Sequence, residues 1–95
     1  MGAGFATSIE LTVLRLLIDA PCGMYGLELV KASGGSLKRG TVYVTLNRME
    51  EKGLVKPHTQ HENHPGLPRS VYRITALGSH VLAAAELLGL AAQAR

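Results

Sequence analysis

The side chains of this sequence best suited to chemistry are basic, and they gather in its middle part. Residues 37–75 contain seven lysines and arginines against three acidic residues, a balance of +4, whereas residues 1–36 contain two against three. The whole chain of 95 residues carries a net charge of +3. Clustered cations bind nucleic-acid backbones, because each phosphate they neutralise releases condensed counterions. The charge pattern therefore favours an anionic partner for the middle of the chain.

Three histidines lie in the same segment at a spacing of three. His58, His61 and His64, with Glu62 among them, could ligate zinc or nickel, since imidazole is the commonest metal ligand. The spacing is not a recognised zinc pattern, and prolines and glycine break the region, so the imidazoles share no helical face. We therefore expect no metal or other cofactor, and a solvated loop whose histidines gain charge below about pH 6.5. A metal- or pH-responsive regulator is the weaker alternative.

Other reactive side chains give no sign of an enzyme. Cys22 is the single cysteine, which excludes an internal disulfide and a multi-thiolate metal site. Ser70, His80 and Asp19 lack the context of a nucleophile elbow, and no glycine-rich phosphate loop follows an expected strand. A chain of 95 residues is one small domain, too short for a two-domain enzyme with a cleft between its halves.

Hydropathy points to a folded protein outside the membrane. The hydrophobic fraction is 46% and the mean hydropathy is +0.15, which argues against a disordered chain. Arg15 and Glu86 interrupt the longest apolar runs, so no segment is expected to span a membrane. No secretory signal is visible at the start, and we expect a cytoplasmic protein.

Capping signals and apolar spacing predict three helices in the first half, over residues 8–19, 24–33 and 39–52. Thr7 and Glu10 have the spacing of a capping box for the first helix. In the third, Val42, Leu46 and Met49 share one face. The opposite face is expected to carry polar and cationic side chains, with Gly53 ending the helix. A short extended stretch at residues 36–37 is also conceivable.

The second half reads as a β-hairpin followed by one long helix. Residues 54–59 and 70–74 are expected strands, with Pro57 marking the first as an edge strand and a polar loop between them. Thr75 caps a helix over residues 76–94 that is apolar on nearly every side. One small domain covers only one side of such a helix, so we expect a second copy of the chain on the other. The expected interface residues are Leu82, Leu87, Leu88 and Leu90.

The order of elements predicts a mainly α fold with a small β-hairpin: a winged helix-turn-helix with an extra C-terminal dimerisation helix. Residues 1–75 would form the DNA-binding unit and residues 76–95 the dimerisation helix of the same compact unit. The major groove of DNA admits one α-helix, whose first residues reach the base edges. The expected DNA contacts are Lys38, Arg39, Thr41, Tyr43, Val44, Thr45, Arg48 and Arg69.

Two stretches resemble the PadR family of transcriptional regulators. The stretch GTVYVTLNRMEEKGLV at residues 40–55 is similar to that family's recognition helix, and GLPRSVYRITALG at residues 66–78 is similar to its wing, second strand and helix start. The stretch YGLEL at residues 25–29 resembles the second helix. The resemblance spans residues 11–82 and implies a DNA-binding regulator, often a repressor, that works as a homodimer.

The chain departs from the family pattern at two places. Val44 stands where the family commonly has proline, and a single terminal helix replaces the longer dimerisation domain, as in the short subgroup. No tryptophan is present to form an aromatic platform for a drug-like ligand, so a small-molecule effector stays an open question. We expect a homodimer that binds double-stranded DNA at a pseudo-palindromic operator through the third helix and the wing. The alternative is a winged-helix protein-interaction module without specific DNA binding.

Overall fold

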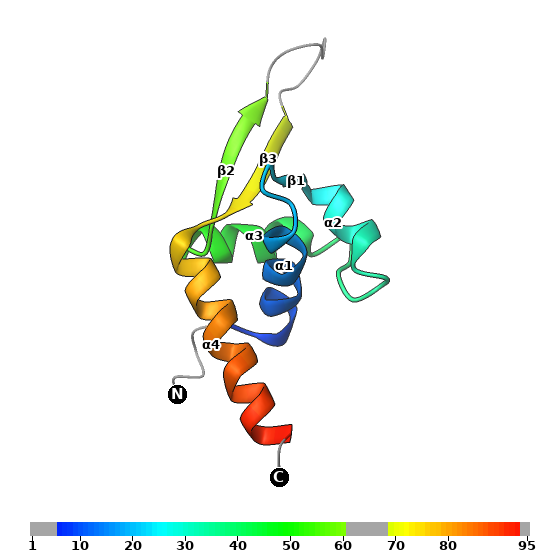
Figure 1. Cartoon of the computed structure of the whole chain (residues 1–95). Helices are drawn as coiled ribbons and strands as arrows, with labels where there is room; N and C mark the ends of the chain where they lie inside the picture. Colours follow the sequence, from blue (N-terminus) through cyan, green and yellow to red (C-terminus); the bar gives the residue numbers. More distant parts are fainter. Residues whose placement is uncertain (1–5, 61–68, 94–95) are drawn as a thin grey trace.

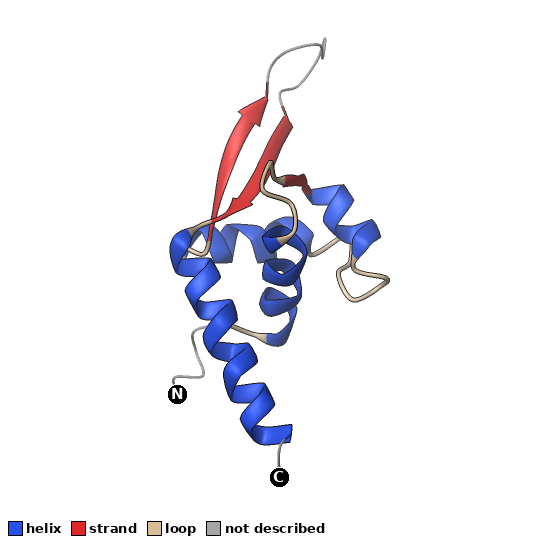
Figure 2. Cartoon of the chain, viewed as in Figure 1, coloured by secondary structure: helices blue, strands red, loops and turns tan. Residues whose placement is uncertain are grey.

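Four helices and a three-stranded antiparallel sheet make up the computed structural model, which describes residues 6–60 and 69–93 (Figure 1). In chain order they are α1 (Ser8–Ile18), β1 (Met24–Tyr25), α2 (Gly26–Ala32), α3 (Val42–Glu51), β2 (Val55–Gln60), β3 (Arg69–Ile74) and α4 (Ala76–Gln93). The ribbon of β2 and β3 projects from one end of the helices, and α4 extends past them at the other end (Figure 2). The mainly helical fold with a wing is confirmed.

The short strand β1 differs from the sequence prediction, which placed its residues at the start of a helix. Met24 pairs with Tyr72 and Tyr25 with Val71, so β1 lies beside β3 in the sheet order β1-β3-β2. Two residues are too few to show a strand period, and only the pairing with β3 defines them. The conceivable extended stretch at residues 36–37 is instead a bend.

The edge position of β2 agrees with the prediction from Pro57. This strand pairs only with β3, from Val55 opposite Ile74 to Gln60 opposite Arg69. On β3 the neighbouring residues Val71 and Tyr72, whose side chains lie on opposite faces of the sheet, are both buried. The Cγ1 atom of Val71 lies close to Gly23, so the turn before β1 covers the face of β3 on which Val71 lies.

Side-chain caps start the first and last helices as the sequence predicts. Glu10 N donates to Thr7 Oγ1 at 3.2 Å, and Thr7 N donates to Glu10 Oε1 at 3.0 Å, which completes the capping box of α1. Gly78 N donates to Thr75 Oγ1 at 3.0 Å in the first turn of α4. The Thr75 hydroxyl also donates to Gly53 O at 2.6 Å. That bond ties the start of α4 to the turn that ends α3.

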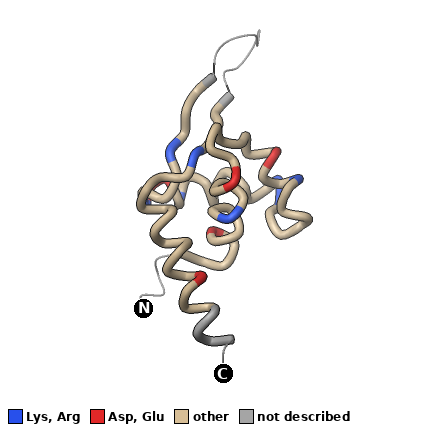
Figure 3. Tube along the Cα trace, viewed as in Figure 1, with Lys and Arg blue, Asp and Glu red and all other residues tan. Residues whose placement is uncertain are grey.

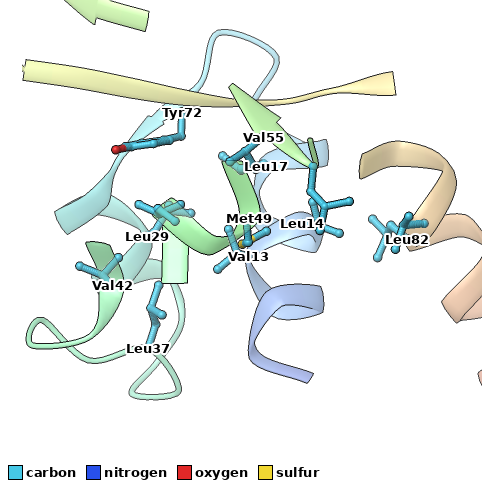
Figure 4. Close-up of a cluster of buried hydrophobic side chains, with 13 residues drawn as sticks. Val13, Leu14, Leu17, Leu29, Leu37, Val42, Met49, Val55, Tyr72 and Leu82 are labelled. Atoms are coloured by element: carbon cyan, nitrogen blue, oxygen red, sulfur yellow. The ribbon is translucent and has the colours of Figure 1, made fainter. Parts of the chain in front are cut away.

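One cluster of buried side chains joins all four helices to the sheet (Figure 4). Its members are Val13, Leu14, Leu17, Leu29, Leu37, Val42, Leu46, Met49, Leu54, Val55, Tyr72, Val81 and Leu82. Each fully buried aliphatic side chain contributes about 1.5–3 kcal/mol relative to its exposed state. Leu82 reaches from α4 toward Leu14 and is only 4% exposed. It therefore belongs to the protomer core, which corrects its assignment to the dimer interface.

The close approach of α4 to the start of β2 leads to a stability prediction for Gly78. A Cβ at this position would overlap the backbone carbonyl oxygen of Leu54, which cannot move aside as a flexible side chain would. We expect Gly78→Ala to lower the free energy of unfolding by about 3 kcal/mol in urea titration, because overpacking a rigid contact strains the backbone. A Cβ at Gly40 would meet nothing within 4 Å, so Gly40→Ala is the matched control. Equal stability of the two variants would contradict the contact.

Candidate nucleic-acid interface

Helix α3 presents two different faces, and the core determines which one meets solvent. Val42, Leu46 and Met49 are 0% exposed and pack inside the protein. The opposite side is exposed along its whole length, and we call Thr41, Val44, Asn47, Arg48 and Glu51 the outer face of α3. The two faces predicted from helical spacing are thus present. Thr45 is only 8% exposed, so the structure removes it from the expected contact surface.

The turn between α2 and α3 places two cations at the start of the outer face. The Ser33 hydroxyl donates to Val30 O at 2.8 Å and accepts from Leu37 N at 3.0 Å, and Leu37 is buried. This anchors the turn to the core. Val42 N then donates to Lys38 O at 2.9 Å, which begins the helix. Lys38 and the next residue, Arg39, are therefore held in solvent just before α3.

The cations of this region are available to an anionic partner. Lys38, Arg39 and Arg48 are exposed, and within residues 6–60 and 69–93 none of them forms an ion pair. The tube view shows lysine and arginine along the chain near α3 and on both strands of the ribbon, whereas the described part of α4 carries none (Figure 3). The positive charge is thus concentrated around α3 and the wing.

The base of the wing adds two cations that the sequence prediction did not single out. Lys56 on β2 and Arg73 on β3 are exposed cross-strand partners. Like charges directly opposite each other destabilise a ribbon, and a bound anion would offset that repulsion. Both residues lie in the predicted strands, but only the register of the strand pair shows that they stand opposite each other.

Tyr43 stands at the edge of the outer face and also packs against the neighbouring helix. It is 49% exposed, and a Cβ on Gly26 would lie 2.7 Å from its ring. Tyr43 thus packs on α2 with part of its side chain and leaves the rest exposed beside the outer face. Nearby, burial first and then the Glu50 carboxylate and Tyr43 raise the pKa of Tyr72 above its usual value. The Tyr72 phenol thus stays neutral well beyond physiological pH.

An ion pair fixes the far end of α3. Lys52 Nζ donates to Glu10 Oε1 at 2.8 Å, and the Glu10 side chain is 1% exposed while that of Lys52 is 25% exposed. Within the described residues the other oxygen of Glu10 has no hydrogen-bond partner. Lys52 is therefore the group that offsets this buried charge, and it links the end of α3 to the start of α1.

For Arg69 only the backbone is described, and part of the polar loop between the two wing strands lies outside the described residues. Arg69 pairs with Gln60 at the tip of the described ribbon, and of its side chain nothing is described. His61, Glu62 and His64 lie outside the described residues, while His58 is half-buried in β2. In the described part of the chain no group of three or more possible metal ligands occurs. No described helix is long and apolar enough to cross a membrane.

A family model for PadR-like transcriptional regulators matches residues 13–84, which include every member of the buried hydrophobic cluster and both strands of the wing. The chain belongs to the PadR-like family. The expected resemblance is thereby confirmed, and with it a winged-helix DNA-binding fold. Proteins of this family are regulators of transcription, which are generally not enzymes.

Solved PadR-family structures show the same architecture. A PadR family transcription regulator of Clostridium difficile R20291 is 30% identical with a TM-score of 0.73, and the match covers 85% of each chain. A PadR family regulator of Eggerthella lenta DSM 2243 is 29% identical with a TM-score of 0.69, and the match covers 83% of this chain and 71% of the Eggerthella protein.

A further match is the PcaV transcriptional regulator of Streptomyces coelicolor, solved in complex with its natural ligand. It is 25% identical with a TM-score of 0.71, and the match covers 84% of this chain but 52% of PcaV. A comparison with curated proteins gives no match. Membership of the PadR-like family places this chain among DNA-binding transcriptional regulators.

The Glu10–Lys52 pair generates a prediction about how firmly this PadR-like protein holds α3. We expect Lys52→Ala to lower the free energy of unfolding by about 2–3 kcal/mol, because it leaves the buried Glu10 carboxylate without a cation. The exposed pair of Arg15 and Glu86, at 3.5 Å, provides the control, and Glu86→Gln should cost less than about 1 kcal/mol. Urea titration of both variants checks this, and a Lys52→Ala cost no larger than the control's would contradict the role of the pair.

Proposed function

We propose that this PadR-like protein is a sequence-specific repressor that binds a pseudo-palindromic operator as a homodimer, with α3 in the major groove and the wing beside it. The observation that carries the proposal is the outer face of α3, which is solvent-exposed and flanked by cations that form no ion pair within the described residues. A regulator of this kind would act sterically, by occupying promoter DNA.

The dimensions and charges of α3 suit a groove entered from its N-terminal end. Ten residues make a helix about 15 Å long, and with side chains it is about as wide as the 12 Å major groove. Lys38 and Arg39 precede its first turn, whereas Glu50 and Glu51 occupy its last. Phosphates attract the first end and repel the second. The outer-face side chains of α3 that precede Glu50 are therefore the ones placed to reach the bases.

The wing supplies a second set of backbone contacts. Lys56 and Arg73 lie at the base of the ribbon, and Arg69 begins β3 near its tip. Contacts of this kind fix the position of a protein on DNA without reading its sequence. In our proposal the ribbon follows the phosphate backbone next to the groove that α3 occupies, and Tyr43 can add its hydroxyl at the edge.

The exposed side of α4 supports the proposed dimer. Leu87 is 69% exposed and Leu88 71%, while Leu77 in the first turn is 40% exposed. Glu86 of α4 forms an ion pair with Arg15 of α1, so this polar side chain is used within the protomer. Neighbouring exposed leucines mark association surfaces, and a symmetry mate is the commonest partner. The interface residues retained are Leu87 and Leu88, with Leu90, whose side chain is not described.

Binding to DNA at several salt concentrations tests the proposed contact face. We expect Arg39→Ala and Arg48→Ala each to weaken binding to a mixed-sequence duplex and to reduce the salt dependence by about one phosphate, or about 0.9 in the slope of log affinity against log salt. Fluorescence anisotropy titrations measure both quantities.

Arg15→Ala is the control for the loss of one positive charge, because Arg15 lies on α1 and pairs with Glu86. It should leave affinity and slope close to those of the wild type. If both arginine variants bind DNA as the wild type does, the outer face of α3 is not the DNA contact surface. A wild-type affinity that hardly changes with salt would instead favour the protein-interaction module.

A charged side chain on α4 tests the dimer. We expect Leu88→Glu to yield folded monomers, because two buried carboxylates would face an apolar partner surface without a cation. Light scattering at several concentrations gives the mass. Leu27→Glu, on an exposed leucine of α2, is the matched control and should remain dimeric. A Leu88→Glu protein of dimer mass would refute this interface.

A further inference from the structure

Two uncharged side chains occupy the centre of the outer face of α3. Val44 is 55% exposed, and Asn47 is exposed one turn later. Within the described residues the Asn47 amide forms no hydrogen bond, and Val44 is absent from the apolar groups that pack on the core. Neither valine nor asparagine is a strong helix former. Local stability therefore does not explain either residue in the middle of a ten-residue helix.

The chemistry of Asn47 matches one base better than the others. A side-chain amide presents one donor and one acceptor side by side, which is the complement of adenine's N7 acceptor and N6 donor in the major groove. Guanine offers two acceptors there, so one half of the amide would be unmatched. An arginine would suit guanine instead, and Arg48 lies beside Asn47 on the same helix.

Val44 complements the partner of that base. Residues three apart on a helix have Cβ atoms about 5–6 Å apart, so Val44 and Asn47 can reach the same base pair or two adjacent ones. Thymine is the base that carries a methyl group in the major groove, and apolar side chains contact it. An adenine–thymine pair thus offers a site for both side chains.

The acidic end of α3 limits which residues of the outer face can contact bases. Glu51 follows Asn47 by one turn on the same face. Its carboxylate, beside that of Glu50, repels the phosphates that line the groove. Asn47 and Arg48 are therefore the last positions on this face that can approach a base without bringing an acid into the groove, and Val44 lies between them and the cationic start.

We propose that Asn47 and Val44 are specificity-determining residues, which read an adenine–thymine element in each half-site. Asn47 bonds the adenine edge, and Val44 packs against a thymine methyl group. The proposal rests on the proposed function, since it requires α3 to enter the major groove. Arg39, in contrast, lies before the helix and would position the protein through phosphate.

Selection from a random duplex pool, followed by sequencing, tests the proposal. The proteins compared are the wild type, Asn47→Ala, Val44→Ala and Arg39→Ala. We expect the wild type to enrich a palindrome with an invariant A·T position in each half, and Asn47→Ala to lose the preference there by about tenfold. Arg39→Ala should bind more weakly while enriching the same sequence. Thermal unfolding confirms that each variant is folded.

Base analogues in the enriched duplex separate the two contacts. Replacing the invariant adenine by 7-deazaadenine removes the N7 acceptor, and should weaken the wild type by about tenfold but hardly affect Asn47→Ala. Replacing thymine by uracil removes one methyl group, and should weaken the wild type about fourfold but hardly affect Val44→Ala.

The outcomes distinguish this inference from the function on which it rests. An enriched palindrome whose bases are read equally well by Asn47→Ala and Val44→Ala would overturn the assignment of these residues, while the operator-binding function would stand. A wild-type protein that enriches no sequence at all would overturn the operator-binding function, and the inference with it.

Discussion

The burial of one edge of α3 is the constraint on which the rest of the interface depends. Val42, Leu46 and Met49 are fully excluded from water, and together their burial is worth several kcal/mol. A helix turns about 100° per residue, so fixing these three side chains also fixes where every other side chain of α3 points. The outer face is thus a consequence of the core. Any rotation of α3 that hid Arg48 would have to expose Met49 or Leu46.

Contacts at both ends keep α3 from sliding or tilting on that core. At its start the buried Leu37 and the Ser33 hydroxyl hold the preceding turn, and the ring of Tyr43 lies against Gly26. At its end Lys52 bonds to the buried Glu10. A helix that reads bases, as we propose for α3, benefits from such support, since its donors and acceptors must be held within about 0.5 Å of the productive geometry. The groups that support α3 are apolar, small or paired with an opposite charge, whereas the side chains of its outer face are exposed.

The sequence was sufficient to predict the fold because its local signals agree with one another. The capping box at Thr7, the apolar spacing in α3 and Pro57 at a strand edge each indicated the element that the structure contains. Strand β1 was missed because its two residues become a strand only by pairing with β3, more than forty residues later. Helical periodicity likewise could not show whether Thr45 is buried, because this residue lies at the boundary between the two faces. The surrounding structure covers it.

Some parts of the interface depend on contacts between residues far apart in the chain, and the sequence could not assign them. Lys56 and Arg73 become neighbours through strand register, which a single sequence does not specify. Leu82 and Leu88 looked alike on a helix that is apolar nearly all round, yet α1 covers the first and not the second. The side of a uniformly apolar helix that faces the core is set by its neighbours, so periodicity alone cannot identify it.

In the proposed dimer, one part of α4 is fixed to its own protomer and another part contacts the partner. The helix therefore links association to the spacing of the two DNA-binding surfaces. Its first turns are fixed to the protomer, because Gly78 contacts the backbone of Leu54 and Leu82 packs in the core. Its later turns extend past the other helices (Figure 1), and Leu87 and Leu88 in this part of α4 are exposed. A continuous helix transmits orientation from one part to the other, so the docking of α4 on α1 sets how the two copies of α3 are placed relative to each other. Half-sites about one helical turn of DNA apart, 34–36 Å, would then require no hinge within the protomer, only the rigid attachment that the close contact at Gly78 provides.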